Sequence, residues 1–147
     1  MNILLTGGAG YIGSHVLLNI IENNHQVTVI DDLSTGHKNL IPKDIQLINC
    51  NINNKENLNN VLKSEKFDVL MHFAGFVKVE ESVHNPNKYF LNNTDNAIKL
   101  FETCYENGLN KIIFSSTAAV YGKTINNKPI SEEIILNPLN PYGQSKL

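Results

Sequence analysis

The N-terminal residues pass from an apolar run through a glycine-rich turn into a stretch with helical spacing. Residues 2–6 read Asn-Ile-Leu-Leu-Thr, and Gly8, Gly10 and Gly13 follow in the pattern G-x-G-x-x-G. Glycines let the chain turn tightly and let a phosphate approach the backbone closely. The N–H groups at a helix start, and the positive end of its dipole, would then face that anion. The pattern predicts a strand, a phosphate-binding loop and a helix, whereas the glycines alone would fit any tight turn.

The residues after this loop complete a βαβ unit. Apolar side chains recur at helical spacing from Tyr11 to about Asn24, and a second apolar run, residues 26–31, ends in Asp31. An acid about 20 residues past such a loop is placed to accept a hydrogen bond from a ribose hydroxyl. We therefore predict that the unit binds a dinucleotide. Asp31 favours NAD over NADP, because a 2′-phosphate at that position would meet a carboxylate.

The rest of the chain continues to alternate short apolar runs with helical patterns. Further strands are expected at residues 45–48, 68–73 and 111–115, and helices from Asn54 to about Lys63 and from Asn87 to about Asn107. This alternation predicts an α/β fold, a doubly wound parallel sheet of the Rossmann type with strand order 3-2-1-4-5. Ligands of such sheets bind beyond the carboxyl ends of the strands, where the order reverses between strands 1 and 4. The polar stretch from Lys123 to Pro141 is expected on the surface.

Composition excludes several classes of partner. The 147 residues carry a net charge of −2, so we expect neither a nucleic-acid surface nor binding to an anionic membrane. No stretch approaches the ~20 apolar residues that span a bilayer. Cys50 and Cys104 are expected to be reduced and buried. We expect a cytoplasmic protein that holds no metal ion.

Small and hydroxyl-bearing residues stand at the predicted carboxyl ends of strands 4 and 5. Strand 4 ends at Phe73, Ala74 and Gly75, a second loop that lets backbone approach a cofactor. Strand 5 is followed by Ser115-Ser116-Thr117, whose hydroxyls either bind a substrate or cap the next turn.

Tyr142 and Lys146 stand four residues apart directly after Pro141, so a helix beginning there would place both on one face. A free tyrosine has a pKa near 10, so only about 0.1% is phenolate at pH 7. A cation within ~4–6 Å lowers such a pKa by roughly 1–3 units. Beside a nicotinamide and a hydroxyl, the pair would form a hydride-transfer triad with Tyr142 as the base.

Six sequence blocks together resemble the extended short-chain dehydrogenase/reductases of the NAD-dependent epimerase/dehydratase family. They are residues 6–15, 31–37, 72–75, 81–83, 115–122 and 141–146. Within that family they are most similar to 4-epimerases of UDP-hexoses, which interconvert UDP-glucose and UDP-galactose. The resemblance implies that NAD takes the hydride of the sugar C4 and returns it to the other face, with the cofactor held tightly throughout. It also implies a homodimer for the full-length enzyme.

The resemblance assigns roles position by position. Around the pyrophosphate it places Gly7, Gly10, Tyr11, Ile12 and Gly13, and beside the adenosine ribose Asp31 and Asp32. Around the adenine it places Asn51 and Ile52, and around the nicotinamide half Phe73, Ala74, Gly75 and Asn92. Thr117 would bond the 4-hydroxyl, Tyr142 would take its proton, and Lys146 would bind the nicotinamide ribose and tune Tyr142.

Several positions depart from the family pattern. Asn51 stands where the family usually has an aspartate, and Asp32 replaces a common asparagine. Val77 occupies a position where a lysine is frequent, and residues 94–96 differ from the usual Val-x-Gly. Residues 118–119 are alanines where a 4,6-dehydratase has Asp-Glu, which argues against that activity.

The family pattern continues well beyond Leu147, the last residue of this sequence. We therefore expect residues 1–147 to form the N-terminal part of the NAD-binding domain, truncated after strand 5 and the start of the next helix, without the part that binds the nucleotide sugar. We expect this chain alone to be inactive, marginally stable and prone to associate. Two alternatives remain open: a 4-epimerase of UDP-glucuronate or UDP-N-acetylglucosamine, and a non-catalytic NAD-binding module.

Overall fold

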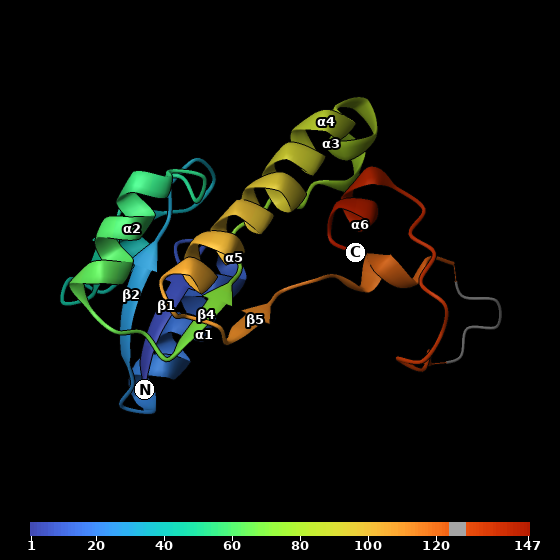
Figure 1. Ribbon diagram of the computed structural model, residues 1–147. Helices are drawn as coiled ribbons and strands as arrows, with labels where there is room; N and C mark the ends of the chain where they lie inside the picture. Colours follow the sequence, from blue (N-terminus) through green and yellow to red (C-terminus); the bar gives the residue numbers. More distant parts are fainter. Residues whose placement is uncertain (124–128) are drawn as a thin grey trace. The chain divides into compact units, whose positions relative to one another are not determined.

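The structure is a computed structural model that describes residues 1–123 and 129–147 (Figure 1). The described chain divides into two compact units. Unit 1 comprises residues 1–75 and 96–115, and unit 2 comprises residues 76–95 and 116–147. Residues 124–128 of the polar stretch expected from Lys123 to Pro141 lie outside the described part.

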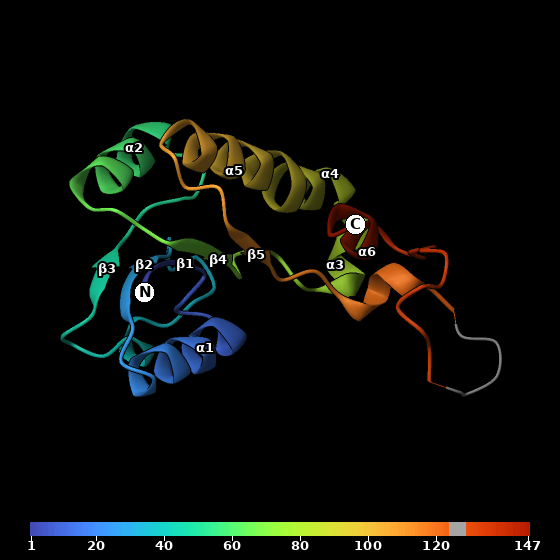
Figure 2. The ribbon, with the colours of Figure 1, turned by 60° about the horizontal axis from the view of Figure 1, so that its bottom comes forward.

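Unit 1 is built on a parallel sheet of five strands (Figure 2). The strands are β1 (Asn2–Thr6), β2 (Gln26–Ile30), β3 (Gln46–Ile48), β4 (Val69–His72) and β5 (Ile112–Phe114). Their spatial order is β3-β2-β1-β4-β5, and each neighbouring pair is parallel. This confirms the doubly wound sheet and the strand order, with each of the last four strands one to two residues shorter than its apolar run.

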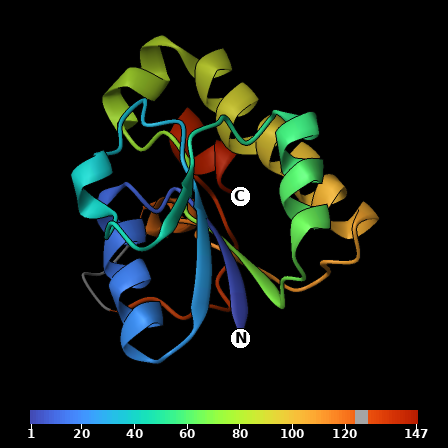
Figure 3. The ribbon, with the colours of Figure 1, turned by 90° about the vertical axis from the view of Figure 1, so that its left-hand side faces the viewer.

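Helices cover both faces of the sheet in unit 1. Helix α1 (Tyr11–Glu22) lies on one face, and α2 (Lys55–Ser64) and α5 (Asn96–Glu106) lie on the other (Figures 2 and 3). Because strand side chains alternate between faces, Ile3 and Leu5 pack with Leu17 of α1, whereas Leu4 joins the core beneath α2 and α5. Two separate apolar cores therefore hold the sheet.

Local sequence explains where two of these helices begin and end. The side chain of Asn54 accepts a hydrogen bond from the Asn57 N–H at 3.0 Å and so caps the start of α2. Gly108 follows α5 with φ of +82°, and the N–H groups of Gly108 and Leu109 bond back to Tyr105 and Cys104. This is the Schellman arrangement, which confirms the expected glycine cap.

Unit 2 contains short helices. They are α3 (Val79–His84), α4 (Pro86–Tyr89), the π-helical segment η2 (Phe90–Asp95), the 3-10 turn η3 (Ala118–Tyr121) and α6 (Pro141–Ser145). The long helix expected from Asn87 to Asn107 is thus found as three consecutive segments, α4, η2 and α5. The sequence did not predict α3, η3 or the short 3-10 turn η1 (Lys38–Leu40), because each is too short to show a periodic pattern.

Both cysteines are free and buried, as expected. Burial raises the pKa of the Cys104 thiol to about 12. Among residues 1–123 and 129–147, no helix combines the length and the apolar character needed to cross a bilayer.

Candidate functional site

The loop between β1 and α1 is folded tightly upon itself and against the end of β4. Gly7 has φ of +76°, and a Cβ there would lie 2.4 Å from the Ala74 nitrogen. A Cβ on Gly13 would lie 2.0 Å from the Gly7 carbonyl oxygen. Neither position can hold a larger residue without moving backbone. Glycine is therefore required at positions 7 and 13 by the fold of the loop itself.

The start of α1 is open to a ligand. Gly10 is the residue that caps this helix, and it supplies no side-chain hydrogen bond to the first turn. The first N–H groups of a helix have no partner within the helix, so they bond to solvent or to an anion. Tyr11 and Ile12, in that first turn, are 80% and 58% exposed. The arrangement fits a pyrophosphate held by backbone N–H groups.

Asp31 braces this loop. One carboxylate oxygen accepts the Ala9 N–H at 2.9 Å, and the other accepts the Leu33 N–H at 2.9 Å. Asp31 is only 8% exposed, so its side chain is part of the folded framework. Each carboxylate oxygen can accept a second bond, which leaves capacity for a ribose hydroxyl. The sequence predicted a ligand role alone and missed the bond to Ala9.

Asp32 and Asn51 are joined directly. The Asn51 amide nitrogen donates to a carboxylate oxygen of Asp32 at 2.7 Å. The other oxygen of Asp32 accepts the Ser34 N–H at 3.0 Å. Burial raises the pKa of Asp32, but the hydrogen bonds from Ser34 and Asn51 outweigh it and bring the pKa below its ordinary value. The two positions that depart separately from the family pattern are thus in contact.

The carboxyl ends of β1 and β4 are locked together where the strand order reverses. The Thr6 hydroxyl and His72 Nδ1 lie 2.6 Å apart, and both residues are fully buried. The Phe73 N–H bonds to the Thr6 carbonyl at 2.9 Å. This places the predicted Phe73–Gly75 loop beside Gly7, at the position where doubly wound sheets bind ligands.

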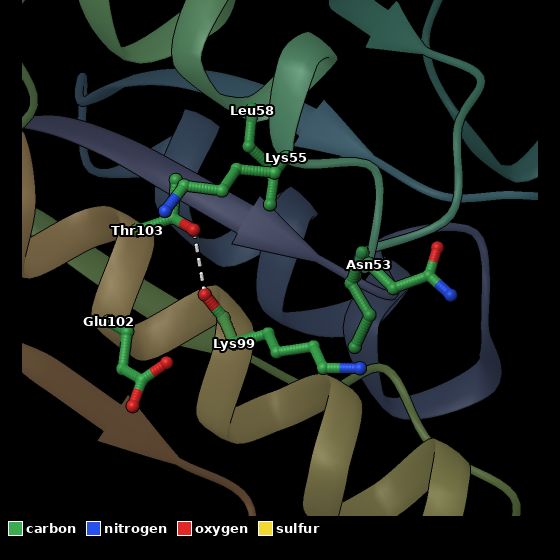
Figure 4. A pocket seen from close by; sticks show the side chains of 7 residues that line it. Asn53, Lys55, Leu58, Lys99, Glu102 and Thr103 are labelled. Carbon is green, nitrogen blue, oxygen red and sulfur yellow. Dashed lines mark hydrogen bonds between the residues drawn. The ribbon is translucent and has the colours of Figure 1, made fainter.

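Ile52, expected beside the adenine, is 5% exposed and lines a hollow between α2 and α5 (Figure 4). The hollow is also lined by Asn53, Lys55, Leu58, Lys99, Glu102 and Thr103. It includes none of the glycine-loop residues. Lys55 on its rim forms an ion pair of 2.8 Å with Glu106. The hollow is therefore a feature separate from the loop that fits a phosphate.

In unit 2, Tyr142 lies in α6, as expected, whereas Lys146 directly follows the last residue of this helix. Asn140 caps this helix by accepting the Gly143 N–H at 2.8 Å, and Pro141 occupies its first turn. Lys146 is buried, and burial lowers the pKa of its ammonium to about 8. The cation expected to assist Tyr142 thus loses its proton more readily than an ordinary lysine.

Three hydroxyl or amide side chains anchor the end of α6. Asn93 donates to the Ser145 hydroxyl at 3.0 Å, and the Thr94 hydroxyl donates to the Ser145 carbonyl at 3.0 Å. The Ser116 hydroxyl donates to the Lys146 carbonyl at 2.8 Å. Asn92, predicted beside the nicotinamide, donates to the Asn93 side chain at 3.0 Å. Sequence reasoning missed Asn93, because no local pattern distinguishes it from the neighbouring asparagine.

Tyr142 also has an aromatic neighbour. The rings of Tyr89 and Tyr142 meet edge to face, with centroids 6.4 Å apart. The Tyr89 hydroxyl donates to Glu81 at 3.0 Å. Burial and the bond to Glu81 raise the pKa of Tyr89 to about 12, so it remains a neutral phenol.

The Thr117 hydroxyl caps the turn η3 by accepting the Ala119 N–H at 3.2 Å. Capping the next turn is one of the two roles that the sequence allows for the hydroxyls of residues 115–117. The hydroxyl hydrogen remains able to donate to another oxygen.

The predicted site residues fall into two groups by unit. Unit 1 holds Gly7, Gly10, Tyr11, Ile12, Gly13, Asp31, Asp32, Asn51, Ile52, Phe73, Ala74 and Gly75. Unit 2 holds Asn92, Thr117, Tyr142 and Lys146. Within the described parts of both, no group of histidine, cysteine, aspartate or glutamate residues is arranged to hold a metal ion.

Comparison with known proteins shows which proteins the chain resembles in sequence and fold. The UDP-glucose 4-epimerase of Azospirillum brasilense is 46% identical over 145 residues, which are 99% of this chain and 41% of that protein. Two solved structures are also similar, and each of them aligns with 99% of this chain. The UDP-glucose 4-epimerase of Thermus thermophilus in complex with NAD has a TM-score of 0.95 at 31% identity. The UDP-Glc/GlcNAc 4-epimerase of Campylobacter jejuni has a TM-score of 0.92 at 43% identity.

This chain covers 47% and 45% of those two structures, so it spans less than half the length of the relatives it matches. The model of the NAD dependent epimerase/dehydratase family matches residues 3–147. Because this match extends over nearly all of the sequence, the chain belongs to the NAD dependent epimerase/dehydratase family.

Proposed function

We propose that the chain is the N-terminal, NAD-binding part of a nucleotide-sugar 4-epimerase that acts on a UDP-hexose. The observation that carries this proposal is the loop from Gly7 to Gly13. Backbone contacts leave no room for a Cβ at Gly7 or Gly13, Asp31 braces the loop, and the helix start that follows has no side-chain cap. These features fit a dinucleotide pyrophosphate and its ribose.

When bound, NAD supplies reversible hydride acceptance. The N–H groups at the start of α1 would hold its pyrophosphate, and the spare lone pairs of Asp31 would accept from the adenosine ribose. Tyr142 would take the proton of the sugar hydroxyl, and Thr117 would orient that hydroxyl through its own hydrogen. Lys146 would bind the nicotinamide ribose and, while protonated, favour the phenolate of Tyr142.

The substrate class follows from the relatives. The proteins of Azospirillum brasilense and Thermus thermophilus are named UDP-glucose 4-epimerases, which supports UDP-glucose and UDP-galactose. The Campylobacter jejuni protein is titled a UDP-Glc/GlcNAc 4-epimerase, which favours UDP-N-acetylglucosamine as a second candidate. The relatives are more than twice as long as this chain, so we infer that residues 1–147 bind NAD but do not turn over a UDP-sugar alone.

Calorimetric titration of the 147-residue protein with NAD tests the cofactor assignment. Saturable binding of one NAD per chain is expected, and the absence of binding by a folded protein would overturn the proposal. Turnover of UDP-galactose is measured in parallel, with Tyr142→Phe as the matched variant. Turnover by the 147 residues that Tyr142→Phe abolishes would support the epimerase assignment and refute the inactivity of this portion.

A further inference from the structure

The loops that leave β2 and β3 are joined by side chains at the same edge of the sheet. β2 and β3 are neighbouring strands, and the Asp31 N–H bonds to the Ile48 carbonyl at 3.2 Å just beyond their paired residues. The next contact between the two loops is the hydrogen bond of 2.7 Å from Asn51 to Asp32. It therefore connects two loops that the backbone ladder no longer holds together.

Each member of this pair also closes its own loop. Asp32 accepts the Ser34 N–H at 3.0 Å, and the side-chain Oδ1 of Asn51 accepts the Asn53 N–H at 3.1 Å. These are the local turns that aspartate and asparagine side chains favour. Rotating either side chain to make another contact would break both a turn and the bond between the loops.

The pair is continuous with the glycine loop. Asp32 follows Asp31, whose carboxylate accepts the Ala9 N–H. Hydrogen bonds thus run from the loop after β3, through the loop after β2, to the loop that fits the pyrophosphate. Asp32 is exposed, so its charge faces the solvent in which a cofactor arrives.

We propose that Asp32 and Asn51 act as one unit, a clasp that fixes the adenosine end of the cofactor site and holds the Asp32 carboxylate there as a second determinant, beside Asp31, of selection for NAD over NADP. This inference rests on the proposed NAD binding. The lowered pKa of Asp32 agrees with a carboxylate that stays ionised. The nearby Cys50 thiol stays neutral, because burial and, to a smaller extent, the charge of Asp32 raise its pKa.

The chemistry of the pair permits a charge exchange. In a double variant carrying Asp32→Asn and Asn51→Asp, an amide at one position still donates to a carboxylate at the other, and both turns keep their acceptor oxygens. Asn51→Asp alone puts two carboxylates at hydrogen-bond distance, where they cannot both be ionised without cost. Asp32→Asn alone keeps a weaker amide–amide bond and removes the charge.

The test measures dissociation constants for NAD and NADP by calorimetry for the natural chain, both single variants and the double variant. At about pH 8, Asn51→Asp is expected to weaken NAD binding by roughly 10–100-fold, the usual worth of a hydrogen bond to a charged group. The double variant is expected to return NAD affinity to within about threefold of the natural chain. Asp32→Asn is expected to narrow the preference for NAD over NADP by about three- to tenfold.

Two controls carry the same chemical changes outside the clasp. Asn53→Asp places a new carboxylate on the same loop, and Asp44→Asn removes an exposed one elsewhere; neither is expected to change the NAD dissociation constant by more than about twofold. Thermal unfolding without cofactor reports on the clasp independently: the midpoint should fall in Asn51→Asp and recover in the double variant.

The outcomes separate this inference from the proposed function. If the natural chain binds NAD but the double variant binds it no better than Asn51→Asp, the clasp is overturned and NAD binding stands. An unchanged NADP preference in Asp32→Asn would overturn its selective role. If no variant binds NAD, the proposed function and the selective role both fail, and recovery of the unfolding midpoint alone decides whether the clasp exists.

Discussion

The side-chain amide of Asn93 donates to the hydroxyl of Ser145 at 3.0 Å, which ties the π-helical segment η2 to α6. The Asn93 side chain also accepts the Phe76 N–H at 2.8 Å and donates to the Phe76 carbonyl at 2.9 Å. Asn93 is only 2% exposed. One buried amide therefore holds together three segments of unit 2, among them the helix that carries Tyr142.

Replacing Asn93 should destabilise unit 2 strongly. Asn93→Ala leaves the half-buried Phe76 N–H and carbonyl without these partners, and each lost partner costs about 1–3 kcal/mol. Urea unfolding should show a loss of at least about 2 kcal/mol. Asn87→Ala, on the exposed surface of α4, is the matched control and should stay within about 0.5 kcal/mol of the natural chain. Equal stability of the two variants would show that Asn93 is not an anchor.

Asp31 should contribute to stability as well as to cofactor choice. Asp31→Ala removes the acceptor of the Ala9 and Leu33 N–H groups, so the free energy of unfolding should fall by about 1–3 kcal/mol before any ligand is added. Asp31→Asn keeps one acceptor oxygen and should lose less. In calorimetry, both changes should narrow the preference for NAD over NADP. Equal or tighter binding of NADP by the natural chain would refute the role assigned to Asp31.

The buried Lys146 should make stability depend on pH in the alkaline range. Burial lowers its pKa to about 8 in the folded state, against 10.5 for an ordinary lysine. Below pH 8 both states carry the proton and the folded state bears the cost of a buried ammonium, on the order of 3 kcal/mol. Between pH 8 and 10.5 the unfolded state binds more protons, so this contribution makes stability rise with pH.

Lys146→Met tests that dependence. The variant should be more stable than the natural chain at about pH 7, and the difference should disappear above about pH 10.5. Lys43→Met, at an exposed position, should show no such convergence. Denaturant unfolding across this range provides the measurement, and a constant difference between Lys146→Met and the natural chain would contradict the lowered pKa.

The edge of the sheet at β5 should promote association. In the described chain β5 pairs with β4 on one side, and its Ile112 and Ile113 are 38% and 49% exposed. An apolar edge strand is a template for pairing with another chain. Light scattering should detect oligomers of the natural chain, and Ile113→Lys should reduce them. Ile98 on α5 is equally exposed, at 49%, but lies away from the sheet edge. Ile98→Lys should therefore leave the amount of oligomer unchanged. A monodisperse monomer with a cooperative melt well above 50 °C would refute this expectation.

Sequence alone predicted the features whose determinants lie close together along the chain. The glycine loop, the acid after β2 and the alternation of apolar runs define a βαβ unit locally, so the parallel sheet and its strand order could be predicted from these patterns. Pro141, Tyr142 and Lys146 predicted α6 for the same reason, since a proline at the helix start and an i,i+4 pair fit within one short segment. The ends of the elements, the helices too short to show a period and the π-helical segment η2 within the expected long helix escaped this reasoning.

The tertiary structure decided which side chains meet. Asp32 and Asn51 are 19 residues apart, and Asn93 and Ser145 are 52 apart, so no periodicity or local spacing connects them. The sequence likewise predicted Asp31 as a ligand residue and Lys146 as a cation, but not that Asp31 braces the loop or that Lys146 is buried. Such properties depend on desolvation and on hydrogen bonds between distant segments. They arise only when packing brings those segments to one place. The motifs could therefore be identified in the sequence, whereas the contacts between them could not.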